Sequence, residues 1–159
     1  MSALKRIAAT AALLIIISTG WAAPANAVPG IETALSVITA AHGHYVWAAA
    51  SPAAADCSGL VSVAQSIAMG QPPHRLGDTH SLLAGHWPGA IPGASPDDAF
   101  VIGVSPSHMV ARIDGVGIEA RTKGQPYLIG DQAASPWDQQ FTRQYHIDPA
   151  LLIGDSNGT

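Results

Sequence analysis

The stretch Asp56-Cys57-Ser58-Gly59-Leu60-Val61 organises the sequence, because it places the chain's only cysteine at the start of an amphipathic segment. Asp56 is a favourable N-cap residue, so Cys57 is expected in the first turn of a helix. The segment continues with apolar side chains at the three- and four-residue spacing of a half-buried helix: Leu60, Val61, Val63, Ala64, Ile67 and Ala68.

The position of Cys57 makes it a candidate nucleophile. A thiol in the first turn of a helix feels the positive end of the helix dipole, which favours the thiolate, the form that attacks carbonyl carbons. The small neighbours Ser58 and Gly59 leave room for a substrate backbone to approach the sulfur. The alternative is a buried thiol that serves only as a small apolar side chain, as free cysteine often does.

The first 27 residues have the pattern of a secretory signal peptide. Lys5 and Arg6 form a basic start, residues 7–17 are apolar, and a small-residue cleavage site ends at Ala27. The apolar run is too short for a membrane span. We therefore expect a secreted protein, extracellular, periplasmic or associated with the cell wall, with no membrane anchor after cleavage. Residues 28–159 would then form a single domain, with a core at 44–130 and a C-terminal tail at 131–159.

Charge and cysteine content narrow the possible functions. Removing Lys5 and Arg6 from the seven basic residues leaves five against 11 acidic ones, a net charge of −6 with His neutral. That balance argues against nucleic acid as a partner. Oxidising compartments favour paired cysteines, and this chain cannot form an internal pair. The thiol of an exported chain is then buried, intermolecular or catalytic.

The remaining pattern predicts a mixture of helices, strands and loops. Before Cys57 we expect a helix at 31–41, an extended stretch at 44–47 and a loop at 48–55. After the cysteine helix, a Pro- and Gly-rich segment at 70–96 predicts a long ordered surface loop, followed by a strand at 100–104. Towards the end we expect a strand at 127–129, a short helix at 137–145 and a helix start at Asp148-Pro149.

A β-hairpin carries the second group of candidate residues. Residues 108–113 and 116–121 flank Asp114-Gly115, a strong signal for a two-residue turn. Such a turn predicts three apolar pairs on one face: Ile113 with Val116, Ala111 with Ile118, and Met109 with Ala120. The other face carries His108, Val110, Arg112, Gly117, Glu119 and Arg121. On it His108 and Glu119 are diagonal neighbours, about 7–8 Å apart at the backbone and within reach of each other's side chains.

This geometry would complete the apparatus of a cysteine nucleophile. His108 would accept the Cys57 proton and later donate it to the leaving amine, while Glu119 would fix the tautomer of the imidazole. The backbone N–H of Cys57, with the Tyr45 hydroxyl, would bind the oxyanion. The alternative for His108 and Glu119 is a solvated hairpin face with an incidental charge pair.

Two further groups have alternative interpretations. Arg112 and Arg121 share the face of His108 and would either hold a substrate carboxylate or be solvated. His42-x-His44 is a possible metal pair, but no Asp or Glu completes a familiar ligand spacing, so we expect neither a metal nor another cofactor.

These residues together resemble the NlpC family of papain-like cell-wall cysteine peptidases. The resemblance lies in Tyr45-x-Trp47, in the run 56–61, and in Ser107-His108 opening a hairpin that ends in Ile118-Glu119-Ala120. It implies an α+β papain-like fold of the NlpC type, in which N-terminal helices, one carrying Cys57, pack on an antiparallel sheet carrying His108. It also implies Cys57 as nucleophile, His108 as base and Glu119 as third polar residue. Substrate and oxyanion would be bound by Tyr45, Trp47, Asp56 and Ser58.

The activity that the resemblance implies is cleavage of peptide bonds in peptidoglycan stem peptides, without a cofactor. The part from His108 to Glu119 also looks like exported or phage-tail members of the group, although members more often have His where this chain has Glu119. Three alternatives remain: a CHAP-like N-acetylmuramoyl-L-alanine amidase, an acyltransferase of the same fold, and a catalytically inactive module that binds the cell wall or a partner.

Overall fold

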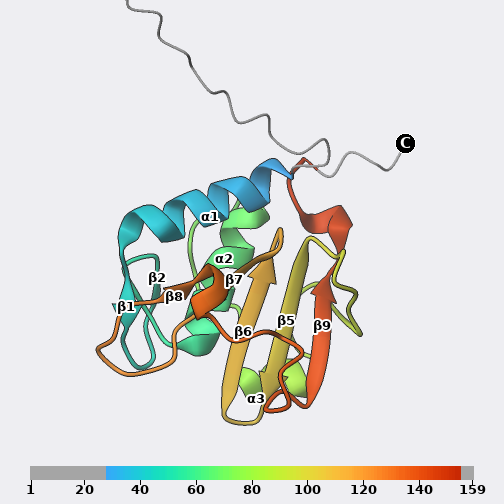
Figure 1. The fold of residues 1–159 in the computed structure, drawn as a ribbon. Helices are drawn as coiled ribbons and strands as arrows, with labels where there is room; N and C mark the ends of the chain where they lie inside the picture. Colours follow the sequence, from blue (N-terminus) through green and yellow to red (C-terminus); the bar gives the residue numbers. More distant parts are fainter. Residues whose placement is uncertain (1–27, 155–159) are drawn as a thin grey trace, which may run out of the picture.

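Two helices and a six-stranded sheet form the framework of the protein (Figure 1). A computed structural model describes residues 28–154, so the predicted signal peptide at 1–27 lies outside the described residues. The helices α1 (Pro29–Ala41) and α2 (Cys57–Ala68) pack against each other, and α2 also packs on the sheet. No helix in the described part is long and apolar enough to cross a membrane.

The large sheet is antiparallel throughout and joins distant parts of the sequence. Its strand order is β4-β9-β5-β6-β7-β8. In that order the strands are Ala90–Pro92, Arg143–Ile147, Phe100–Ser105, His108–Ile113, Val116–Glu119 and Leu128–Ile129. The predicted α+β class, with a cysteine-bearing helix on an antiparallel sheet that carries His108, is therefore confirmed.

The helix that begins at Cys57 is more deeply buried than its amphipathic pattern predicts. Every residue from 58 to 68 is buried, because α1 and the sheet cover two sides and the following segment covers a third. The polar side chain of Gln65 is satisfied in this interior: it accepts a hydrogen bond from Trp87 Nε1 and donates one to the carbonyl of Pro88, both at 2.7 Å. At Gly30, α1 approaches so closely that a Cβ would lie 2.1 Å from the carbonyl oxygen of Ala68.

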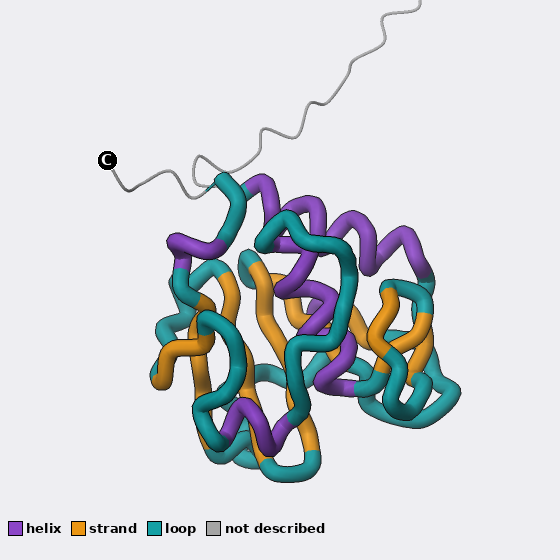
Figure 2. Tube along the Cα trace, turned by 180° about the vertical axis from the view of Figure 1, so that it is seen from behind, coloured by secondary structure: helices purple, strands orange, loops and turns teal. Residues whose placement is uncertain are grey.

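Two predicted loops contain regular structure. The predicted loop at 48–55 forms the paired strands β2 (Ala50–Ser51) and β3 (Ala54–Ala55), and β3 also pairs with β1 (His44–Tyr45). The segment at 70–96 runs down the back of the molecule to a short helix, α3 (Thr79–Leu83), and then supplies strand β4 (Figure 2). These elements are short and have no strong periodicity of their own, so the sequence pattern does not reveal them.

The predicted central hairpin is confirmed. Ile113 pairs with Val116 and Ala111 with Ile118. Asp114 and Gly115 both have positive φ, at 46° and 77°, as a type I′ turn requires. The third predicted pair, Met109 with Ala120, lies beyond the end of β7.

The C-terminal part of the described chain differs from its predicted structure. Residues 137–145 do not form a helix; instead β9 inserts between β4 and β5 and pairs with both. The predicted helix start at Asp148 is present as a 3₁₀ turn, Pro149–Leu151, in which the Asp148 side chain accepts from the backbone N–H of Ala150. The predicted strand at 127–129 is β8.

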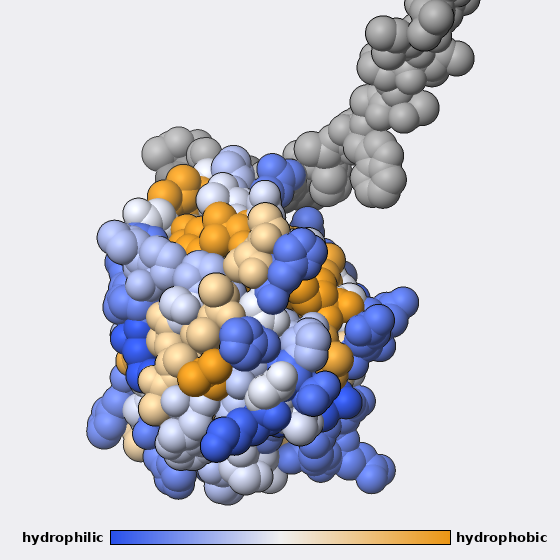
Figure 3. Space-filling model, turned by 90° about the vertical axis from the view of Figure 1, so that its left-hand side faces the viewer, coloured by the Kyte–Doolittle hydropathy of each residue, from blue (hydrophilic) through white to orange (hydrophobic). Residues whose placement is uncertain are grey.

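The second face of the hairpin is covered rather than solvated. Val110 is fully buried in a small cluster with Ala134 and Phe141. Residues 130–141 therefore cover the sheet on the side of Val110, whereas α2 covers the side of Met109 and Ala111. The face of the protein seen in Figure 3 shows only small apolar patches separated by polar residues.

Candidate active site

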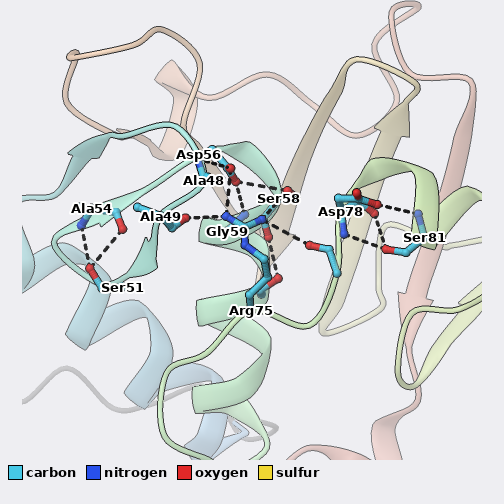
Figure 4. Close-up of polar contacts among 12 residues, drawn as sticks. Ala48, Ala49, Ser51, Ala54, Asp56, Ser58, Gly59, Arg75, Asp78 and Ser81 are labelled. Atoms are coloured by element: carbon cyan, nitrogen blue, oxygen red, sulfur yellow. Dashed lines mark hydrogen bonds and ion pairs between the residues drawn. The ribbon is translucent and has the colours of Figure 1, made fainter.

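Asp56 fixes the start of α2 and thereby the position of Cys57. Its Oδ1 accepts hydrogen bonds from the backbone N–H of Gly59 at 2.7 Å and from Ser58 Oγ at 3.2 Å (Figure 4). The predicted N-cap is confirmed, and Cys57 is the first residue of the helix, partly exposed and without a disulfide partner.

Arg75 completes this arrangement from the loop after α2. Its Nη2 lies 2.9 Å from Asp56 Oδ2 and donates to the carbonyl of Ala49 at 2.7 Å, while Nη1 donates to Ser58 Oγ at 3.0 Å. One guanidinium thus links the start of α2 and the β2 strand region to the loop that follows α2. Asp56 and Ser58, predicted to bind substrate or oxyanion, are occupied in holding this structure.

Arg75 was not among the residues predicted from the sequence. It stands in a segment with no helical or strand periodicity, and its partners Ser58 and Asp56 lie 17 and 19 positions earlier in the chain. Gly59 belongs to the same cluster, because a Cβ there would lie 2.1 Å from the carbonyl oxygen of Ala49. Only glycine lets the β2 region pack this closely on the helix.

His108 and Glu119 form the predicted pair across the hairpin. Their contact joins His108 Nε2 and Glu119 Oε1 at 2.7 Å. Glu119 is 1% exposed, and its carboxylate also accepts from Arg121 through both oxygens and from the backbone N–H of Ala134 at 2.7 Å. Phe141 stacks on the imidazole with ring centroids 6.0 Å apart. Residues in the predicted tail therefore help to hold this pair.

The surroundings of Glu119 favour its ionised form. Burial by itself raises the pKa of a carboxyl, but hydrogen bonds from His108, Arg121 and Ala134 outweigh it and lower the pKa of Glu119 to about 2. A permanent negative charge is thereby fixed beside the imidazole.

His108 also faces Cys57, where the start of α2 packs beside β6. Burial lowers the pKa of the imidazole, but hydrogen bonds with the Cys57 thiol and with Glu119 outweigh it and raise the pKa of His108 to about 9. Because Nε2 is engaged by Glu119, the ring nitrogen left for Cys57 is Nδ1. The arrangement favours an imidazolium placed between the Cys57 sulfur and the ionised Glu119 carboxylate.

Tyr45 lies near the sulfur, on β1. Burial raises the pKa of its hydroxyl, and the negative charges of Cys57 and Asp56 raise it further. The hydroxyl therefore stays protonated and remains a hydrogen-bond donor at neutral pH.

A cavity of about 610 Å³ opens beside Cys57. Its walls include Trp47, Arg75, the N-terminal part of α3 and the turn between β5 and β6. Trp47 is 74% exposed, so it belongs to the cavity wall and not to the core. Because Cys57 is one of the lining residues, the cavity gives a ligand direct access to the sulfur.

Two alternatives from the sequence are not supported. Arg121 is engaged by Glu119, and Arg112 donates to the Gly115 carbonyl at 3.0 Å with its guanidinium 5.9 Å from the Trp137 ring, so neither arginine is arranged to hold a substrate carboxylate. Among residues 28–154, no three His, Cys, Asp or Glu side chains come together as a metal site would require. His42 instead ends α1 in a left-handed conformation.

Comparison with known proteins gives matches among solved structures alone. No protein-family model matches the chain, and no curated protein matches it. Among solved structures four chains match. One is the crystal structure of the NlpC/p60 domain of the peptidoglycan hydrolase SagA, with a TM-score of 0.47 and 19% sequence identity, covering 74% of this chain and 97% of that chain.

Proposed function

We propose that this chain is an exported cysteine hydrolase that cleaves peptide bonds in peptidoglycan stem peptides, with Cys57 as nucleophile, His108 as general base and Glu119 as the residue that orients the imidazole. One observation carries the proposal: a single imidazole contacts both the cysteine at a helix start and a buried, ionised carboxylate. This is the arrangement required to activate a thiol and then to return its proton to a leaving group.

The reaction follows from these positions. The Cys57 thiolate attacks the carbonyl carbon, and the backbone N–H of Cys57 with the Tyr45 hydroxyl stabilises the resulting oxyanion. The C–N bond breaks as His108 Nδ1 donates its proton to the departing amine, which leaves a thioester on Cys57. His108 then takes a proton from water, the hydroxide attacks the thioester, and the peptide acid and the thiol are released.

The substrate class is supported by the sequence. The residues that carry the chemistry fall in the motifs that resemble the NlpC family, whose members act on cell-wall peptides. The basic start, apolar run and small-residue cleavage site support export to the compartment where peptidoglycan lies. The cavity beside Cys57 has room for several residues of an extended peptide.

A CHAP-like amidase that cuts between the sugar and the first L-alanine is the second candidate. The specific observation in its favour is the glutamate at the third position of the set. An acyltransferase would need an acceptor amine, and an inactive binding module would have an ordinary, slowly reacting thiol.

Mass spectrometry of defined muropeptides incubated with residues 28–159 tests the proposal, with Cys57→Ala as the control. We expect fragments cut within the stem peptide for the parent protein and none for the variant. Release of the intact stem peptide would select the amidase. Absence of turnover on several wall chemistries, together with ordinary reactivity of Cys57 towards iodoacetamide, would select the binding module.

A further inference from the structure

The cavity beside Cys57 contains a carboxylate that the proposed reaction does not use, that of Asp78. Asp78 is the N-cap of α3: its Oδ1 accepts from the backbone N–H of Ser81 at 2.8 Å (Figure 4). In the part of the chain that the structure describes, Asp78 forms no ion pair with an arginine or lysine, although the backbone N–H of His80 also donates towards its carboxylate. The hydrogen bond from Ser81 is the main cause of a lowered pKa of Asp78, so the group is ionised at neutral pH.

The other charges around the cavity are compensated. Asp56 lies 2.9 Å from Arg75. The His108 imidazolium lies between Cys57 and Glu119, and Glu119 is paired in turn with Arg121. His80 is the one other titratable side chain on the described cavity wall, and it is exposed. Of the two carboxylates on the described cavity wall, Asp78 is therefore the one without an arginine partner.

Trp47 is a second residue of the cavity wall that would attract a cation. Its ring lines the cavity and is largely exposed. The face of an indole attracts cations more strongly than any other side-chain ring. A carboxylate without an arginine partner and an exposed indole on the wall of one cavity both favour a positively charged ligand group.

We propose that Asp78 and Trp47 form a subsite for a cationic group of the substrate, a primary ammonium close to the bond that Cys57 attacks. The ammonium would pair with the Asp78 carboxylate and contact the Trp47 ring. The identification of this ligand as part of a substrate rests on the proposed function. The preference of the cavity for cations does not, since it follows from the walls alone.

The lone cysteine allows a test without any substrate. Methanethiosulfonates form a disulfide with the Cys57 thiolate and release methanesulfinate, so their rates report access to this one sulfur. We would measure the rates for a 2-aminoethyl (cationic), a methyl (neutral) and a 2-sulfonatoethyl (anionic) reagent, at low ionic strength where charges act over ~30 Å. For each variant, the rate of a charged reagent is divided by the rate of the neutral reagent. This ratio cancels any change that the substitution causes in the intrinsic reactivity of the Cys57 thiol.

We expect the parent protein to prefer the cationic reagent, and Asp78→Asn to lower the ratio of cationic to neutral rates by about threefold or more. Asn is as good an N-cap as Asp, so α3 is retained; Asp78→Ser, another capping residue, is the second variant. Trp47→Ala should lower the ratio and Trp47→Phe should retain part of it. Asp97→Asn, the same charge change on an exposed loop outside the cavity wall, should leave it unchanged.

An unchanged ratio in both Asp78 variants, a preference of the parent for the anionic reagent, or no reaction of Cys57 with any of the three would overturn the subsite. Muropeptide cleavage is a separate readout. A cation preference without muropeptide cleavage would support the subsite and reject the proposed hydrolase. Cleavage without a cation preference would support the hydrolase and reject the subsite.

Discussion

Arg121 holds the Glu119 carboxylate through both oxygens, with Nε 2.9 Å from Oε1 and Nη2 2.7 Å from Oε2. The same Oε1 contacts His108 Nε2. Glu119 is therefore shared between two cations, one of which is the proposed general base. The guanidinium keeps the carboxylate ionised and fixed in direction, so it positions His108 without touching it.

Replacing Arg121 by Gln should shift the acid side of the activity profile. Without the guanidinium the pKa of Glu119 rises from about 2 towards its ordinary value of 4.5. As the pH is lowered, Glu119 is therefore protonated at a higher pH than in the parent protein. We expect the acid limb of kcat/KM, and of Cys57 alkylation by iodoacetamide, to move up by about one pH unit. Arg112→Gln, which removes an arginine that does not contact Glu119, is the matched control and should not move the limb.

Glu119→Gln should slow the proposed reaction by up to about 10⁴-fold, the loss seen when the orienting acid of a serine triad is replaced by its amide. The amide carries no charge, so the pKa of His108 falls from about 9 towards 6.5, and NMR titration of the imidazole would measure this. The variant should also be less stable by about 1–3 kcal/mol, because the hydrogen bonds from His108 and Arg121 lose their anionic acceptor. An unchanged imidazole titration would show that Glu119 does not control His108.

Stability should depend on pH through the same pair. The pKa of Glu119 is depressed in the folded state, so its contribution is present above 4.5 and is lost as the pH falls towards 2. The pKa of His108 is raised, so its contribution is complete below 6.5 and is lost as the pH rises through 9. Urea unfolding should therefore give the highest free energy of unfolding between pH 4.5 and 6.5. In Cys57→Ala the loss on the alkaline side should be smaller, because one of the groups that raise the His108 pKa is gone.

Arg75→Met should loosen the start of α2. The change leaves the buried Asp56 carboxylate without its ion-pair partner and removes the bonds to Ala49 and Ser58. We expect a loss of about 1–3 kcal/mol in the free energy of unfolding and a lower kcat. Arg75→Lys should recover little, because one ammonium cannot serve acceptors spread around a planar guanidinium. Arg143→Gln, at an exposed position of β9, is the control; a loss as large as that of Arg75→Met would contradict the role given to Arg75.

Phe141→Leu tests the cover over the imidazole. Leucine keeps most of the apolar contact with Val110 and Ala134 but removes the ring stacked on His108. We expect kcat to fall while KM stays the same, with a stability loss smaller than the ~3–5 kcal/mol typical of Phe→Ala. An unchanged kcat in Phe141→Leu, with a loss only in Phe141→Ala, would mean that the ring only fills space.

The features that could be predicted are those with local signals. Asp56 caps a helix three residues ahead of the N–H that it accepts from, and Asp114-Gly115 sets the register of adjacent strands. The first signal is enough to predict that Cys57 lies at the start of a helix. The second is enough to predict that His108 and Glu119 meet across the hairpin.

The features that could not be predicted depend on distant partners. Arg75 carries no pattern of its own and gains its role only when the β2 region and the helix start meet around it. The residues of β9 were predicted to lie partly in a helix. Their strand partners in β4 and β5 lie 39 to 57 positions earlier in the chain, so no local pattern indicates the pairing. Ala134 contributes a backbone N–H, which no side-chain pattern encodes.

The insertion of β9 between β4 and β5 makes completion of the sheet depend on the last strand of the described chain. Until residues 143–147 arrive, β5 has an open edge where β9 belongs, and most pairings of the sheet's outer half are long-range and slow to form. A nascent chain that already contains Cys57, His108 and Glu119 would lack Phe141 and a closed sheet. Cys57 and His108 would thus reach their final arrangement only after residues 141–147 have been made and have paired with the rest of the sheet.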